Sequence, residues 1–383
     1  MNKSLKFFIV TILLFFSGSH CYSSNSGIDS VPFNIERGNL YINISIDNKA
    51  YKFLFSSTGY SSVSNELIKK YDIKVNSENQ TVRNTVFYSV KELKIGNTFF
   101  RNIDARALSN NFGSNCAKID GVIGANLLSN MIWKIDYNNG KILFSNSIDD
   151  FEFTQQAKII NFTTVGTNNS PLVSLKVDNV LFENVVVNLG FNGTVNLPIK
   201  DFKNKVNKYK NVVYNGTEKF SGKNQLSLFT EICTMVPKVV IGSSEHGETM
   251  INFFDNGASM IGNKILIDYD VTIDWKNKKI YLDNYAFKEK YRIEDYGFYF
   301  YKRSEKIEVV GLYVDSNADK KGIKNGDIVL KINNVEFSTI SDDELCELYF
   351  NFKNYFNNQA INVTVLRGNE KLNFLIEKQV ILD

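Results

Sequence analysis

Apolar and polar residues alternate along much of this chain, as they do in strands that bury one face of a sheet. Residues 40–51 alternate in this way and turn at Asp47-Asn48, and residues 172–182 alternate similarly and turn at Asp178-Asn179. Each stretch leads into a short apolar strand that ends in small polar residues and a glycine. The pattern predicts a mainly β protein in which one strand-rich unit occurs twice.

Two glycine-bearing segments support the repeat, because each keeps the same distance to the residues that follow it. They are residues 121–128 and residues 260–266. Gly124 stands twelve positions before Asp136, and Gly262 stands twelve positions before Asp274. Matched order and spacing predict two lobes related by a pseudo-twofold axis, with both aspartates forming turns. The alternative is that both glycines are turn residues of an unrelated β-sandwich.

The pattern changes after the second copy, and the remaining sequence predicts a small α+β domain. Residues 322–329 read Gly-Ile-Lys-Asn-Gly-Asp-Ile-Val and lie between apolar strands. Ser341 begins a capping box before a helix that carries Leu345 and Leu348, and two more apolar strands follow. The predicted units are a signal peptide at residues 1–21, two lobes at 33–147 and 157–284, and the C-terminal domain at 290–380.

Composition is compatible with this division and excludes one class of partner. The chain has 383 residues, of which 43% are apolar, and its 30 Phe and 19 Tyr are ample for packed β-rich cores in two or three domains. Lys and Arg total 44 against 41 Asp and Glu, so the charge is nearly balanced. No strong field favours nucleic acid, and no nucleic-acid partner is expected.

The N-terminus predicts export. Two lysines precede an apolar run at residues 7–16, and three small residues follow it. Ten residues are too few to span a bilayer, which needs about 20, and no later stretch is long enough. We therefore expect a periplasmic, cell-surface or secreted protein without a transmembrane segment. Cys21 suggests an acylated bacterial lipoprotein, whereas His20 before it fits that cleavage poorly, so a lipid anchor at Cys21 and plain release both stay open.

The remaining cysteines and the second histidine predict neither a metal site nor a cofactor. Cys116, Cys233 and Cys346 are far apart and have no Cys-x-x-Cys spacing, so we expect buried, unpaired thiols. His246 lies in a Gly- and Ser-rich stretch and is expected to be a solvated loop residue. One histidine with scattered carboxylates does not make a metal site.

The two short apolar strands carry a resemblance. They read Phe-Leu-Phe-Ser-Ser-Thr-Gly at residues 53–59 and Val-Val-Val-Asn-Leu-Gly at residues 185–190. Each resembles the hydrophobic-hydrophobic-Asp-Thr-Gly signature of bilobal retropepsin-like and pepsin-like aspartic proteases, and with the glycine segments the resemblance covers residues 33–284. It implies two aspartic-protease-like β lobes in which Ser57 and Asn188 occupy the positions of the catalytic aspartates. The glycine segments would brace these loops where two backbones approach closely.

The chemistry of that family requires two carboxyls that share one proton. The first loop keeps Thr58 and Gly59, whereas the second keeps Gly190 and has Leu189 in place of the threonine. In the family the threonine hydroxyls grip across the lobes, and the glycines let the loop backbone donate to the carboxylates. A hydroxyl and an amide cannot accept a proton near neutral pH, so we expect no catalytic residue and a pseudoprotease that binds peptides. The alternatives are an active aspartyl-type endopeptidase and a purely structural pair of lobes.

The C-terminal domain resembles a PDZ domain on the strength of residues 322–334, which read Gly-Ile-Lys-Asn-Gly-Asp-Ile-Val-Leu-Lys-Ile-Asn-Asn. The resemblance implies that a peptide or protein ligand is captured by strand addition beside the helix at residues 341–350. A backbone loop at Tyr296-Gly297 would receive a terminal carboxylate, whereas the charge of Asp295 favours an internal or intramolecular segment. The implied peptide-binding residues are Tyr296, Gly297, Phe298, Tyr299, Phe300, Leu345 and Leu348.

Overall fold

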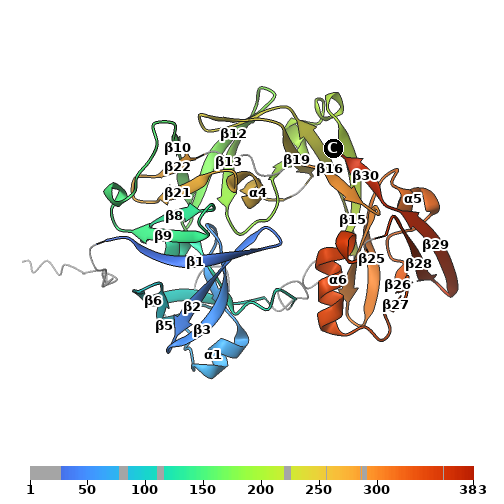
Figure 1. Ribbon diagram of the computed structural model, residues 1–383, viewed down its shortest axis with the longest axis horizontal. Coiled ribbons are helices and arrows are strands. Elements are labelled where there is room, and N and C mark those ends of the chain that lie inside the picture. Colours follow the sequence, from blue (N-terminus) through green and yellow to red (C-terminus); the bar gives the residue numbers. More distant parts are fainter. Residues whose placement is uncertain are drawn as a thin grey trace, which may run out of the picture.

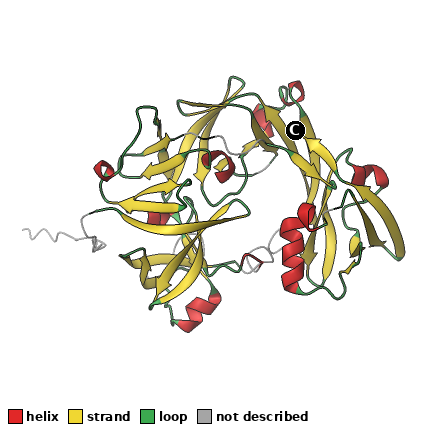
Figure 2. Ribbon diagram, viewed as in Figure 1, coloured by secondary structure: helices red, strands yellow, loops and turns green. Residues whose placement is uncertain are grey.

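The computed structural model describes residues 27–76, 85–109, 116–219, 226–255, 257–284, 286, 291–356 and 358–383. The predicted signal peptide and the proposed anchor at Cys21 lie outside these residues. Strands account for 53% of the structure and helices for 13%, which confirms the predicted mainly β class. None of the helices in the described part of the chain has the length and apolar character needed to span a bilayer. Figure 2 shows short helices set among long, twisted strands.

The first unit is a sheet that closes on itself, because β5 pairs with β6 and also with β2. Its apolar residues alternate along the strands and fill the interior with Phe53, Phe55, Phe100 and Trp133, all at most 1% exposed. Its elements are β1 (Asp29–Glu36), β2 (Asn39–Ile46), β3 (Lys49–Phe55), β4 (Ser61–Val63), α1 (Asn65–Lys70), β5 (Tyr88–Ile95), β6 (Thr98–Ala107), β7 (Gly121–Ile123), α3 (Ala125–Leu128), β8 (Ile132–Asp136) and β9 (Lys141–Ser145).

The second unit follows after the short 3-10 helix η1 (Ile148–Asp150) and repeats several features of the first. Its elements are β10 (Lys158–Asn161), β11 (Thr163–Val165), β12 (Ser170–Val177), β13 (Val180–Asn188), β14 (Val195–Pro198), η2 (Ile199–Asp201), η3 (Val206–Lys208), β15 (Asn211–Lys219), β16 (Leu226–Val236), β17 (Val239–Ile241), β18 (Ser244–His246), β19 (Thr249–Phe254), β20 (Met260–Gly262), α4 (Asn263–Leu266), β21 (Asp270–Asp274) and β22 (Lys279–Asp283). One hydrophobic core extends through both units.

The two units share a sheet, in which β21 of the second pairs antiparallel with β8 of the first. Each of these strands ends in a tight turn with the same chemistry. Asp136 accepts a hydrogen bond from the Asn139 backbone N–H, and Asp274 accepts one from Asn277 N–H, at 2.9 and 3.0 Å. The two aspartates therefore form turns, as the sequence predicts.

The predicted repeat is visible in the strand pairing around the two glycines. β3 runs parallel to β7 and β13 runs parallel to β20, and a four-residue helix follows each partner strand. Gly124 and Gly262 cap these helices with φ of −105° in both. A Cβ on Gly124 would lie 2.5 Å from the Tyr60 carbonyl carbon, and one on Gly262 would lie 2.2 Å from the Gly193 oxygen. The close backbone approach expected at these glycines is therefore present.

The C-terminal unit has its own hydrophobic core and continues the sheet of the second unit. Residues Tyr214 to Gly216 of β15 pair antiparallel with Gly311 to Tyr313 of β25, on the right of Figure 1. Ser341 caps α6 by accepting the Glu344 N–H at 3.2 Å, as predicted. The elements are β23 (Ile293–Asp295), β24 (Phe298–Arg303), β25 (Lys306–Tyr313), α5 (Asn317–Lys321), β26 (Ile328–Ile332), β27 (Val335–Glu336), α6 (Asp342–Tyr355), β28 (Ala360–Arg367), β29 (Glu370–Glu377) and β30 (Gln379–Leu382).

A disulfide joins the first unit to the C-terminal unit. Cys116 and Cys346, 230 residues apart in the sequence, are bonded with their Cα atoms 5.2 Å apart. The prediction of three unpaired thiols is therefore wrong for these two and holds for the buried Cys233. The pairing had no local signal, because it depends on how distant units dock.

Candidate functional site

The loops that follow β3 and β13 meet at the junction of the two units. Ser56 stands directly after β3, and its Oγ donates a hydrogen bond to the Asn188 Oδ1 at 3.2 Å. Ser56 is 6% exposed, and Asn188 is partly buried at the end of β13. The pair that faces across this junction is thus a hydroxyl and an amide from segments 132 positions apart.

Ser57 has a different position from the one predicted for it. Its Oγ donates to the Val187 carbonyl at 2.7 Å and accepts the Leu189 N–H at 2.9 Å. It is fully buried and fastens the first loop to the backbone on both sides of Asn188. The expectation that Ser57 itself stands opposite Asn188 is wrong by one residue, since Ser56 does so.

Strand register explains the one-residue correction. β3 pairs Phe55 with Ile123, so Ser56 stands beside Gly124, and its N–H donates to the Ile123 carbonyl at 2.9 Å. β13 pairs Asn188 with Gly262, the repeat partner of Gly124. Ser56 lies 68 positions before Gly124, whereas Asn188 lies 74 positions before Gly262, so sequence spacing alone could not have identified Ser56.

The two loops also share a turn geometry. The Thr58 N–H donates to Ser56 Oγ at 3.4 Å, and the Gly190 N–H donates to Asn188 Oδ1 at 2.9 Å. In each loop, the side chain that faces the junction therefore accepts a hydrogen bond from the backbone N–H of the residue two positions later in the sequence. Gly59 N–H donates to Ser170 Oγ at 3.0 Å, which adds a second contact between the first loop and the second unit.

Within the described structure, the groups that contact the Ser56 and Asn188 side chains form hydrogen bonds, and none of them is ionisable. Ser56 Oγ contacts the Thr58 hydroxyl and the Asn188 amide, neither of which is a base. Because Asn188 Oδ1 accepts two hydrogen bonds, its Nδ2 amino group points elsewhere, and within the described residues it has no partner. The arrangement can bind a carbonyl oxygen but cannot deprotonate water. The described residues also contain no cluster of His, Cys, Asp and Glu that could hold a metal ion.

His246 is buried rather than solvated, which corrects the expectation from its Gly- and Ser-rich surroundings. It lies in β18 and is 8% exposed, and its Nδ1 pairs with the Tyr269 hydroxyl at 2.9 Å. Burial lowers the pKa of this imidazole to about 4. In the described structure its Nε2 has no hydrogen-bond partner, and the ring packs edge-on against Tyr269.

The residues predicted to bind peptide in the C-terminal unit lie together in its core. Phe298 and Phe300 of β24 contact Phe352 of α6 at centroid distances of 5.3 and 5.1 Å. The buried members of the predicted set are Tyr296, Phe298, Phe300, Leu345 and Leu348. These side chains fill the space between β24 and α6.

The remaining members of that set stand at the loop before β24. Gly297 has φ of +93°, and a Cβ there would lie 2.4 Å from the Ser316 Cβ, so only glycine fits. Tyr299 points the other way, toward Tyr214 and Tyr313, and burial raises its pKa well above the ordinary value. Asp295 accepts the Tyr296 N–H at 2.6 Å.

One edge of β24 borders α6 and has no strand beside it within the described residues. β24 pairs only with β25 there. Besides the Phe298 and Phe300 contacts with Phe352, two contacts join this strand to the flank of α6: Lys302 Nζ lies 2.7 Å from Asp342 Oδ1, and the Tyr301 and Tyr349 rings meet edge to face at 5.6 Å. The edge is thus bordered by a helix that already contacts it.

Comparison with known proteins assigns no family to this chain: no protein-family model matches it, and no curated protein matches it. The geometry described above, together with the sequence motifs, is therefore what supports a function.

Proposed function

We propose that this protein is an exported, non-catalytic relative of the bilobal aspartic proteases, with a PDZ-like C-terminal unit, and that it binds extended peptide or protein segments. The observation that carries the proposal is the pairing of Ser56 with Asn188 at the junction of the two units. A general base contributes about 10²- to 10⁴-fold to a rate, and neither Ser56 nor Asn188 can act as one.

The hydrogen bonds around Ser57 support the resemblance. In the family, the residue after each catalytic acid grips the opposite lobe, and Ser57 bonds to the backbone on both sides of Asn188. Ser56 then takes the position of the first acid and Asn188 that of the second. Thr58 and Gly190 donate backbone N–H groups to these two side chains, as the family's loops do to carboxylates.

A neutral junction suits binding without cleavage. The Asn188 amino group can donate to a peptide carbonyl, and the Ser56 hydroxyl can donate once it turns from Asn188. Hydrogen bonds to a peptide backbone carry little sequence information, so side-chain contacts elsewhere would set the preference.

The C-terminal unit offers a second place for an extended segment. A strand added to the β24 edge would hydrogen-bond to its backbone, as in PDZ domains, and would have to displace the Lys302–Asp342 contact. The Asp295 carboxylate beside Gly297 favours a segment without a terminal carboxylate.

The Cys116–Cys346 disulfide supports export, because disulfides persist in oxidising compartments outside the cytoplasm. The apolar N-terminal run is a separate indication of export. Both features favour a periplasmic, cell-surface or secreted location.

Binding and recovery of an unfolded protein test the proposal together. Fluorescein-labelled β-casein is titrated with the protein at neutral pH, and anisotropy reports binding while gel electrophoresis reports the length of the casein. We expect saturable binding and full-length casein, and weaker binding by Asn188→Ala. Shortened casein, or no binding at any concentration, overturns the proposal.

A further inference from the structure

Helix α6 is held between the core of its own unit and the first unit. One face packs inward through Leu345, Leu348 and Phe352. The opposite face carries four residues at the i, i+3, i+4, i+7 spacing of a single helical stripe. These residues are Asp343, Cys346, Glu347 and Phe350.

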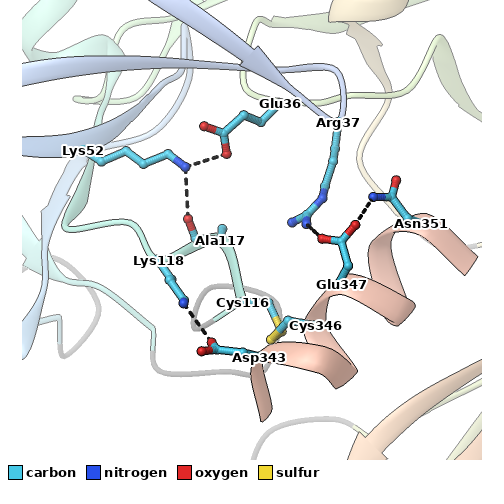
Figure 3. Close-up of polar contacts among 10 residues, drawn as sticks. All are labelled: Glu36, Arg37, Lys52, Cys116, Ala117, Lys118, Asp343, Cys346, Glu347 and Asn351. Atoms are coloured by element: carbon cyan, nitrogen blue, oxygen red, sulfur yellow. Dashed lines mark hydrogen bonds and ion pairs between the residues drawn. A yellow bond between two sulfur atoms is a disulfide. The ribbon is translucent and has the colours of Figure 1, made fainter. Parts of the chain in front are cut away.

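Each residue of that stripe contacts the first unit, as Figure 3 shows for the polar ones. Cys346 is disulfide-bonded to Cys116. Asp343 pairs with Lys118 at 2.8 Å, and Glu347 with Arg37 at 3.7 Å. The Arg37 guanidinium also lies 3.5 Å from the centre of the Phe350 ring. We call this set of contacts the clasp.

The disulfide is the strong part of the clasp. The Lys118 and Asp343 side chains are 69% and 78% exposed, and exposed ion pairs of this kind contribute little because water and salt screen them. The Arg37–Glu347 distance is long for a direct contact. Without the covalent bond, the remaining contacts would hold α6 only weakly against the first unit.

The clasp prevents the movement that would admit a strand between β24 and α6. Asp342 and Tyr349 lie on the flank of α6 between its two packed faces, and both contact β24. An added strand must separate these contacts by shifting α6 away from β24. The first unit and the disulfide stand against the outer face of the helix and restrict that shift.

We propose that the Cys116–Cys346 disulfide is a redox-controlled clasp that keeps α6 closed against the edge of β24, and that its reduction admits an extended polypeptide segment between them. This inference rests on the proposed binding of an extended segment at the β24 edge. Reduction leaves the ion pairs and the Arg37–Phe350 contact, so α6 stays near the first unit but gains freedom to shift.

The disulfide is reduced by thiol–disulfide exchange with a dithiol. One thiolate of the dithiol attacks a disulfide sulfur, which forms a mixed disulfide and releases one cysteine thiolate. The second thiolate of the dithiol then attacks the dithiol's own sulfur in the mixed disulfide. The dithiol closes into a cyclic disulfide, and the second cysteine is released as a thiolate. Two electrons pass to the cysteines, which take up two protons. Cys346 is the more exposed of the two cysteines, so we expect the first attack at its sulfur.

Binding of fluorescein-labelled β-casein, an unfolded protein without cysteine, tests the clasp. The oxidised chain, the chain treated with dithiothreitol and the Cys116→Ser/Cys346→Ser variant are titrated in parallel. We expect the Kd to fall about tenfold in the second and third samples, within the usual range of coupling between two states. The matched control is Cys233→Ser, which keeps the disulfide and should respond to dithiothreitol as the unaltered chain does.

Hydrogen exchange of the same samples separates opening from unfolding. After reduction, the amides of α6 and β24 should exchange faster, while those of β28 and β29 keep their protection. Equal Kd values in all samples, weaker binding after reduction, or loss of protection throughout the C-terminal unit each overturn the clasp. Absence of binding in every sample overturns the proposed function as well, so the two failures are distinguishable.

Discussion

Replacing Ser57 with alanine tests whether this hydroxyl fastens the two units together. The change removes the hydrogen bonds to the Val187 carbonyl and from the Leu189 N–H, and both Ser57 and Leu189 are fully buried. A buried polar group without a partner costs about 1–3 kcal/mol. Two such groups are left, so the free energy of unfolding should fall by roughly 3 kcal/mol, a large part of the ordinary 5–15 kcal/mol.

Urea unfolding followed by tryptophan fluorescence measures this change, because Trp133 lies in the first unit and Trp275 in the second. The midpoint should decrease while the slope stays constant. The matched control is Ser56→Ala, which loses the bond to Asn188 and the contacts with Thr58. Asn188 keeps the Gly190 N–H and Thr58 is partly exposed, so this change should cost about 1 kcal/mol. If both variants cost the same, or Ser57→Ala costs less than about 1 kcal/mol, the assigned grip is refuted.

Three further changes have defined outcomes. The pKa of His246 is about 4 in the folded protein and 6.5 in the unfolded chain, so the contribution of this residue to folding stability is complete above pH 6.5 and is lost as the pH falls toward 4. Urea unfolding across this range should show the free energy of unfolding falling by about 3 kcal/mol, a loss that His246→Phe should not show. Gly124→Ala should lower the free energy of unfolding by about 3 kcal/mol, because the added Cβ would meet backbone atoms. Gly247→Ala, whose Cβ would have no atom within 4 Å, should lower it by less than about 0.5 kcal/mol in the same urea unfolding experiment. The double change Cys116→Ser with Cys346→Ser should lower the free energy of unfolding by about 5 kcal/mol and therefore lower the melting temperature. An unchanged melting temperature would contradict this.

Much of the fold could be predicted because it follows from local pattern. Alternation of apolar residues gives the strands, and the twelve-residue spacing from Gly124 to Asp136 recurs from Gly262 to Asp274 because the same strand, helix and hairpin recur. The capping of α6 by Ser341 follows from a motif four residues long. These features need no knowledge of distant contacts.

The errors arose where the decisive contact is distant. Ser56 and Ser57 are adjacent small polar residues, and only the register of β3 against β7 determines which of them faces Asn188. The disulfide between Cys116 and Cys346 depends on how α6 docks on the first unit, so spacing gave no sign of it. His246 stands in a stretch that looks like a loop, yet β18 pairs with β17 and buries it.

The chemistry at the junction of the two units is tested most directly by peptide hydrolysis. Purified wild-type protein is incubated with β-casein from pH 3 to pH 8, with and without a pepstatin-like inhibitor, and new N-termini are counted by mass spectrometry. We expect no new termini, since Ser56 and Asn188 cannot take a proton from water. Hydrolysis by the wild-type protein that the inhibitor stops, and that Asn188→Ala abolishes, would contradict it.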